Sequence, residues 1–315
     1  MLRYTLRRLS FLPLIIVGVS IITFILLRVL PGDPAAIMAG QNASPEQIQT
    51  IRDDLGLGEP IVVQFFNWVG DLAQGDLGHT YYGNRDILDE VVRRFPASAE
   101  LILLSLAISV VVGTSFGILS AVLRNSRMDY TVRLFAVLGQ SVPEFFLLIL
   151  LIILPSILWN YAAPIGGYVS ILDDPWRNLR MYLPPSLILG IGGAAGIMRL
   201  QRTMMLEVLR SDYVRTARAK GLTTWTVIVS HAFRNTLAPL VTVIGTSFTL
   251  IFGGSVIAER IMSIDGLGVF FLQSVQLRDF PVVQFLVLYT AAVIIVANLI
   301  VDLSYAYIDP RVRYR

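Results

Sequence analysis

The sequence predicts an all-α membrane protein with six transmembrane helices. Of its 315 residues, 55% are apolar and only 15% are charged, and the mean hydropathy is +0.69. Water-soluble domains carry about 25% charged residues. Apolar runs long enough to cross a bilayer recur along the chain, and basic residues gather in alternate polar intervals between them.

The first apolar run covers residues 9–30, and a helix needs about 20 residues to cross a bilayer. Arg3, Arg7 and Arg8 precede it. A secretory signal peptide shares this basic start but has a shorter apolar core and a small-residue cleavage site. We therefore expect residues 9–30 to stay as a transmembrane helix, with residues 1–8 in the cytoplasm.

Residues 31–98 form a polar interval that we expect to be an extracytoplasmic loop, in water on the outer side of the membrane. Ser44-Pro-Glu-Gln47 has the pattern of a helix start with a capping box. A second patch combines aromatic and aliphatic residues at helical spacing: Phe65, Phe66, Trp68, Val69 and Leu72. We interpret this patch as packing against the membrane face or its own loop, and docking of an external partner is the alternative.

The second predicted span covers residues 99–123. It contains Gly113 and Gly117 at the four-residue spacing that lets helices approach closely.

A third span is predicted in the region 134–158. Ser141-Val-Pro-Glu144 fits a second capping box there, and we interpret Glu144 as part of that cap. An ion or proton site is the alternative, because carboxylates are costly inside membranes.

The remaining predicted spans cover residues 183–200, 237–258 and 282–303, and a tail of residues 304–315 follows. The fourth is short and glycine-rich, and its Gly190–Ala195 segment formally matches a dinucleotide fingerprint. No strand precedes that segment, so we reject this interpretation. Gly192 and Gly196 are better explained by close helix packing or a pore wall.

Residues 201–236 are the longest polar interval in the second half of the chain. Ser211 or Asp212 can cap a helix whose C-terminal half is basic, and Gly221 suits the left-handed position that ends it. Thr223 or Thr224 can then start a second helix that ends at about Arg234. Although a basic helix–turn–helix can bind DNA, both ends here enter lipid, so no nucleic-acid partner is expected.

Basic residues fix the expected sidedness. Six spans place both termini and residues 201–236 on one side, and that side holds sixteen of the 25 lysines and arginines. They are Arg3, Arg7, Arg8, Arg124, Arg127, Arg133, Arg199, Arg202, Arg210, Arg215, Arg218, Lys220, Arg234, Arg311, Arg313 and Arg315. The positive-inside rule therefore places this side in the cytoplasm.

Several chemistries are not expected. The chain has no cysteine, and its two histidines, His79 and His231, are far apart without carboxylates at ligand spacing, which argues against a metal site. Lys220, the one lysine, follows an alanine, so the chain lacks a phosphate-binding P-loop. We therefore expect no protein metal site and no ATP hydrolysis by that route.

The predicted spans carry almost no charge in their middles. Proton- and sodium-coupled carriers usually keep ionisable groups there, so a separate motor protein is the expected energy source. An autonomous secondary transporter or channel is the alternative, and a membrane scaffold that does not transport is a third.

Motifs along nearly the whole chain carry a family resemblance. They are Arg28-Val-Leu-Pro-Gly-Asp-Pro34, Leu55-Gly-Leu-Gly-Glu-Pro60, Gly75-Asp-Leu-Gly78, Asp212-Tyr-Val-Arg-Thr-Ala-Arg-Ala-Lys-Gly221, His231-Ala-Phe-Arg-Asn235, Gly266-Leu-Gly268 and Asp309-Pro-Arg311. With these segments the sequence resembles the B-type permease subunit of binding-protein-dependent ABC importers for dipeptides, oligopeptides, glutathione and nickel. The resemblance implies the type I ABC importer permease fold and import of peptides. Import of nickel or glutathione is the alternative, because those branches share the motifs.

The resemblance also implies a transport subunit of a bacterial inner membrane that is not an enzyme and has no cofactor of its own. It implies partners as well. They are a homologous second permease, two ATPase subunits that bind ATP and Mg, and an extracytoplasmic substrate-binding protein.

The resemblance maps a coupling helix that docks on the ATPase to Tyr213, Arg215, Thr216, Ala217, Arg218, Ala219, Lys220 and Gly221. Many importers begin this motif with Glu-Ala-Ala, and the first two positions here are Arg215 and Thr216, so the role of the glutamate does not carry over. Ala217 and Ala219 would allow close approach, and the basic side chains could pair with acidic groups on the motor. A solvated basic face that only sets topology is the alternative.

Overall fold

The computed structural model describes residues 2–29, 32–40 and 43–308, and every element named in this part of the chain is a helix. Side chains are described from residue 13 onward, so those of Arg3, Arg7 and Arg8 lie outside the described residues, as does the tail from Asp309. The chain divides into two compact units. One combines residues 2–96 with 266–296, and the other combines residues 97–265 with the chain from residue 297 onward.

The unit of residues 2–96 and 266–296 holds nearly all of the predicted polar interval 31–98, whose last two residues belong to the other unit. Its elements are α1 (Leu2–Val29), α2 (Pro34–Ala39), α3 (Pro45–Asp54), α4 (Ile61–Gln74), the start of α5 (Ile87–Val122), α12 (Leu267–Leu277) and the first part of α13 (Phe280–Ile308). The first capping box is confirmed: the Ser44 amide donates to Gln47 Oε1 at 2.9 Å, and the Gln47 amide donates to Ser44 Oγ at 3.3 Å.

The aromatic patch of α4 lies partly inside this unit. The rings of Phe65 and Trp68 lie 5.3 and 5.8 Å from the ring of Phe24 on α1. Phe66 is 66% exposed. Two of the patch aromatics therefore pack within the chain, and one remains available to lipid or to another molecule.

The unit of residues 97–265 is a bundle around one long central helix. It contains the rest of α5, α6 (Arg127–Ser141), α7 (Glu144–Trp159), α8 (Pro175–Leu209), α9 (Asp212–Ala219), α10 (Thr224–Thr226), the π-helix η1 (Val227–Phe233), α11 (Arg234–Met262) and the end of α13. The central helix α8 packs against α6, α7 and α11. Asp174 caps it by accepting from the Arg177 amide at 3.0 Å, and Pro175 occupies its first turn.

Close packing at the predicted glycines of α5 is confirmed. A Cβ atom at Gly113 would lie 2.7 Å from Ile197 Cβ, and one at Gly117 would lie 2.7 Å from Gln201 Cβ. Both neighbours belong to α8, so the backbones of α5 and α8 approach where side chains are missing.

Within the described residues, four helices are long and apolar enough to cross a membrane: Ile87–Val122, Pro175–Leu209, Thr224–Met262 and Phe280–Tyr305. The pair α6 and α7 qualifies as a fifth crossing, with a 93° bend between its halves. The described apolar part of α1, Pro13–Val29, is shorter than these. The all-helical membrane fold is thus confirmed, and the count of six spans stays a prediction.

The prediction of a capping box at Ser141–Glu144 is wrong. Ser141 is the last residue of α6, and its hydroxyl donates to the carbonyl of Val137 at 2.8 Å. Pro143 occupies the N-cap position of α7 without a side-chain bond. A proline disfavours the helical conformation of the residue before it, so Val142 adopts extended angles and the break falls after Ser141.

The predicted end of the second cytoplasmic helix near Arg234 is also wrong. Thr223 caps the helix as expected, accepting from the Thr226 amide at 3.3 Å. The chain then continues as α10, η1 and α11 through to Met262. Ile228 and Ala232 are buried with Met205 of α8, and this packing carries the helix through the polar stretch.

Candidate coupling site

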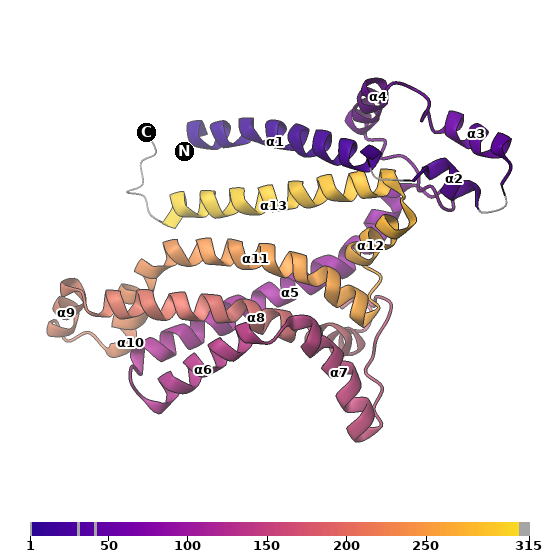
Figure 1. Cartoon of the computed structure of the whole chain (residues 1–315). Coiled ribbons are helices and arrows are strands. Elements are labelled where there is room, and N and C mark those ends of the chain that lie inside the picture. The colour runs from indigo at the N-terminus through magenta and orange to yellow at the C-terminus, as the bar shows by residue number, and fades with distance from the viewer. Residues whose placement is uncertain (1, 30–31, 41–42, 309–315) are drawn as a thin grey trace. The chain divides into compact units, whose positions relative to one another are not determined.

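The predicted coupling segment forms the short helix α9, at one end of α8 and beside α10 (Figure 1). Val214 and Ala217 are buried and form a cluster with Val227 of η1. The opposite face is exposed and mostly basic or small: Arg215, Thr216, Arg218, Ala219 and Lys220. The helix is therefore amphipathic, with one face held by its own chain and the other free.

A left-handed residue ends α9, as predicted. Gly221 has φ +77°, and Lys220 is the C-cap. The Leu222 amide donates to the carbonyl of Ala217 at 3.4 Å, and the Gly221 amide donates to that of Arg218 at 2.9 Å. This pair of hydrogen bonds is the Schellman motif, which provides donors for the last carbonyl groups of a helix.

The start of α9 differs in detail. Ser211 occupies the N-cap position, but its hydroxyl donates to the carbonyl of Val208 at 2.6 Å and makes no cap bond. Asp212 lies in the first turn, where a negative charge is favoured by the helix dipole. Its carboxylate pairs with Arg215 at 3.3 Å on the exposed surface.

The predicted coupling residues do not all share one face. Ala217 is buried and packs with Val214 and Val227 of its own chain, and its role as a coupling residue stays a prediction. The hydroxyl of Tyr213 accepts from Asn235 Nδ2 at 3.0 Å, which links α9 to the first turn of α11. Ala219 is exposed and keeps the small side chain needed for close approach.

Sequence reasoning missed two apolar residues at this site. Trp225 is 74% exposed and Leu222 is 39% exposed, both just after the Gly221 turn. Large apolar side chains inside a polar interval were the available signal. Apolar residues within an exposed polar surface are typical of protein contacts, so the exposed face of α9 and these two residues together form a candidate docking surface.

A buried ion pair lies further along α8. Arg202 Nε donates to Asp129 Oδ1 at 2.8 Å, and Arg202 NH2 donates to Oδ2 at 2.9 Å. Ser120 also donates to the carboxylate, at 2.5 Å, and the Asn125 amide donates to it at 3.0 Å. The pair joins the end of α5, the start of α6 and α8. From the sequence we assigned Arg202 only a topological role, and Asp129 was missed.

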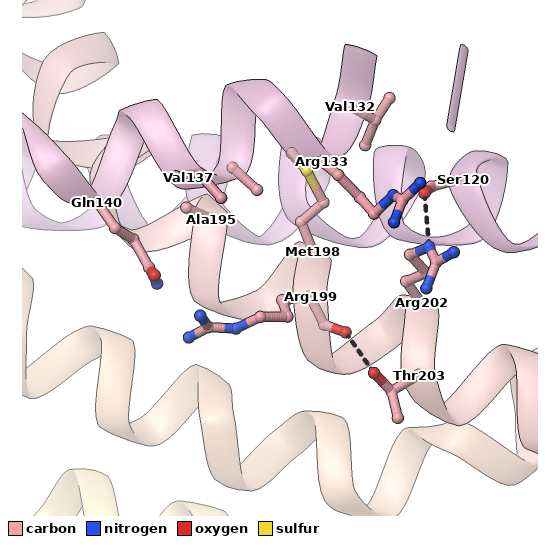
Figure 2. Close-up of a pocket in the computed structure, with 11 residues that line it drawn as sticks. Ser120, Val132, Arg133, Val137, Gln140, Ala195, Met198, Arg199, Arg202 and Thr203 are labelled. Atoms are coloured by element: carbon pink, nitrogen blue, oxygen red, sulfur yellow. Dashed lines mark hydrogen bonds between the residues drawn. The ribbon is translucent and has the colours of Figure 1, made fainter. Parts of the chain in front are cut away.

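A cavity of about 160 Å³ lies beside this pair, between α6 and α8 (Figure 2). Its lining combines apolar residues with three arginines: Ser120, Val132, Arg133, Ala136, Val137, Gln140, Ala195, Met198, Arg199, Arg202 and Thr203. In the described part of the chain, no three His, Cys, Asp or Glu side chains lie close enough together to hold a metal ion.

Long apolar helices packed around α8, with an exposed basic helix at one end, define the helical permease class of transport proteins. The fold matches a chain of the structure titled "Inward facing conformations of the MetNI methionine ABC transporter", with a TM-score of 0.56 and 18% identity. The match covers 70% of this chain and 96% of that chain. The predicted type I permease fold is thereby confirmed.

The chain belongs to the family described as binding-protein-dependent transport system inner membrane component, which matches residues 113–314. The N-terminal domain of the same family matches residues 1–102. The chain is 42% identical over 94% of both chains to a peptide transport system permease protein of Brucella abortus. It is 38% identical over 100% of both chains to the dipeptide transport system permease protein DppB of Escherichia coli. The resemblance seen in the sequence is confirmed, and the chain is an inner-membrane transport component.

Proposed function

We propose that this chain is the transmembrane permease subunit of an ATP-driven ABC importer for peptides of the dipeptide and oligopeptide class. The observation that carries the proposal is similarity over the whole length to relatives named for dipeptide and peptide transport. The chain would form half of the translocation path, and a homologous second permease would form the other half. Two ATPase subunits and an extracytoplasmic substrate-binding protein complete the assembly.

The exposed face of α9 is the proposed contact with the ATPase. Val214 and Ala217 hold the helix on η1, while Arg215, Arg218 and Lys220 present positive charge to a partner. Trp225 and Leu222 add apolar area beside that charge. A movement of the motor would pass through α9 to α11, because Asn235 bonds Tyr213.

The proposal places both termini and α9 in the cytoplasm. The distribution of arginines supports this orientation through the positive-inside rule. ATP and Mg would be bound by the ATPase subunits, and this chain would bind no cofactor.

Reconstitution tests the proposal. The chain is purified with its partner permease and ATPases, placed in proteoliposomes and supplied with the binding protein. We expect dipeptide uptake only when ATP and all partners are present. Uptake of dipeptides by this chain alone would instead indicate an autonomous transporter.

A competition arm addresses the alternative substrates. Unlabelled dipeptide, glutathione and nickel are each added to the same uptake reaction. We expect the dipeptide alone to compete, and competition by nickel or glutathione in its place would move the chain to those branches of the family.

A further inference from the structure

The break between α6 and α7 puts a carboxylate inside the bundle. α6 ends at Ser141, and α7 begins at Glu144 after a 93° bend. Pro143 causes the break, because it disfavours a helical residue before it and offers no amide hydrogen. Broken helices within membrane bundles are typical of transporter binding sites.

Two glycines make room for this carboxylate. A Cβ atom at Gly192 would overlap Glu144 Oε1, and one at Gly254 would lie 2.9 Å from Oε2. Gly192 is the middle residue of α8, and Gly254 belongs to α11. Both helices therefore lack a side chain at the place that Glu144 occupies, and alanine would not fit at Gly192 without displacing it.

Glu144 has no partner of its own among the described residues. It is partly buried, and no hydrogen bond or ion pair joins it to this part of the chain. An ionisable side chain in a membrane bundle is costly unless it is paired or faces a polar path. Because the capping role is ruled out, a cation from outside the chain is the partner that its chemistry fits.

The cavity between α6 and α8 supplies the opposite charge. Arg202 is neutralised by Asp129, and Arg133 lies 3.5 Å from the same carboxylate. Arg199 is exposed and has no acidic partner in the described residues. Figure 2 shows its guanidinium directed away from Arg202 and toward the end of the cavity where Gln140 lies. Gln140 is the penultimate residue of α6, directly before the break, so that end of the cavity is the one nearer Glu144.

The spacing of these groups suits a short zwitterion. Gly192 and Arg199 are seven residues apart on α8, which is roughly 10 Å along the helix axis. An extended peptide advances roughly 3.5 Å per residue, so di- and tripeptides span most of that distance. Gln140 Nε2 lies 3.7 Å from a Cβ atom placed at Gly196, which is between Gly192 and Arg199 on α8, and the Gln140 amide can hydrogen-bond a peptide group.

We propose that the cavity between α6 and α8 and the neighbouring Glu144 together hold a short peptide in transit. Glu144, which lies beyond the cavity lining, binds the α-ammonium group, and Arg199 of the lining binds the terminal carboxylate. This inference rests on the proposed function of peptide import. It assigns a substrate contact to the permease itself. The helix break at Pro143 positions Glu144 for this contact, and Gly192 and Gly254 leave space for its carboxylate.

The test uses the complete complex in proteoliposomes with saturating binding protein and a labelled dipeptide. We expect E144Q and R199Q each to lower uptake at least tenfold, while assembly and ATPase activity without peptide stay within twofold of wild type. R199K keeps the charge and should retain at least half of the uptake. R127Q removes an exposed arginine of α6 that does not line the cavity, and it should behave as wild type.

A fifth variant tests the position of the carboxylate without changing any charge. G192A should lower uptake at least fivefold with assembly intact, because the new methyl group displaces Glu144. If the wild-type complex imports the dipeptide and E144Q and R199Q both show uptake within twofold of wild type, the inference is overturned. The proposal of peptide import would then still stand. Loss of assembly in E144Q and R199Q would also overturn it, since the two residues would then be structural. A wild-type complex that imports no peptide would instead overturn the proposed function.

Discussion

Arg202 and Asp129 form a two-pronged ion pair in which each carboxylate oxygen accepts from a different guanidinium nitrogen, at 2.8 and 2.9 Å. The Asp129 side chain is fully buried, and the Arg202 side chain is 20% exposed. The two residues lie 73 positions apart in the sequence. The pair fixes the start of α6 to α8, and Arg210 and Ser211 connect α8 to α9, the proposed coupling helix.

Replacing Asp129 with asparagine should destabilise this region. Asparagine keeps the shape but leaves the guanidinium of Arg202 without a counter-charge, and breaking a buried pair costs on the order of 3 kcal/mol. We expect the thermal unfolding midpoint of the purified complex to fall by several degrees. R133Q is the matched control, because Arg133 lies 3.5 Å from the same carboxylate but is 43% exposed, and its loss should shift the midpoint little. Equal midpoints for D129N and wild type would contradict the structural role of the pair.

Valine at Gly221 should uncouple the transporter. Gly221 has φ +77°, and a side chain in that conformation costs roughly 1–2 kcal/mol, more for a β-branched residue. No atom lies within 4 Å of a Cβ placed there, so the backbone alone is strained. We expect G221V to assemble but to lose at least fivefold in ATP-driven uptake. G221N is the control, because asparagine tolerates left-handed angles, and it should keep most of the activity. Unimpaired uptake by G221V would show that the turn is not needed.

Replacing Ala217 with leucine should destabilise α9, whereas replacing Ala219 with leucine should weaken the contact with the ATPase. Ala217 is 6% exposed in the cluster that holds α9 on η1, whereas Ala219 is exposed. Overpacking at a buried site costs typically 1–3 kcal/mol, so A217L should make α9 sensitive to limited proteolysis. A219L should leave α9 resistant to protease but lower the amount of ATPase that copurifies with the permease. If the same amount of ATPase copurifies with A219L as with wild type, the exposed face of α9 is not part of the contact with the ATPase.

Stability of the unit that contains Asp279 should fall as pH rises. Burial raises the pKa of Asp279 from its ordinary 3.8 to about 6, although bonds such as that from the Tyr81 amide at 3.0 Å act in the other direction. Since the folded pKa exceeds the unfolded one, the folded state holds the proton more tightly, and this stability is lost as pH rises through about 6. Between pH 5 and 7.5 the expected loss is about 1 kcal/mol.

The measurement is the thermal unfolding midpoint of the complex at both pH values. D279N should reduce the difference between the two midpoints, because asparagine does not titrate. An unchanged difference in D279N would show that other groups cause the pH dependence.

Local chemistry made part of this fold predictable. The cap at Ser44, the close packing at Gly113 and Gly117, and the left-handed turn at Gly221 each follow from rules that act within a few residues. The sequence motifs likewise predicted the protein family. These features needed no knowledge of what lies across the bundle.

The parts that could not be predicted depend on distant residues. Ser141 and Glu144 have the letters of a capping box, but Pro143 puts the break after Ser141, and the glycines that receive Glu144 lie on α8 and α11. Ala217 has the right size for a partner contact, yet the chain buries it against Val227. Periodicity gives the faces of a helix but does not say which neighbour covers each face.

The central claim is that α9 meets the motor on the cytoplasmic side of the membrane, and cysteine cross-linking tests it most directly. The chain has no native cysteine, so A219C and F66C each carry a single thiol. Ala219 is on the exposed face of α9, and Phe66 is exposed on α4. We predict that A219C cross-links to the ATPase subunit and reacts with an impermeant thiol reagent only from the cytoplasmic side, while F66C reacts only from the outer side. Reaction of A219C from outside, with no cross-link to the ATPase, would contradict the account.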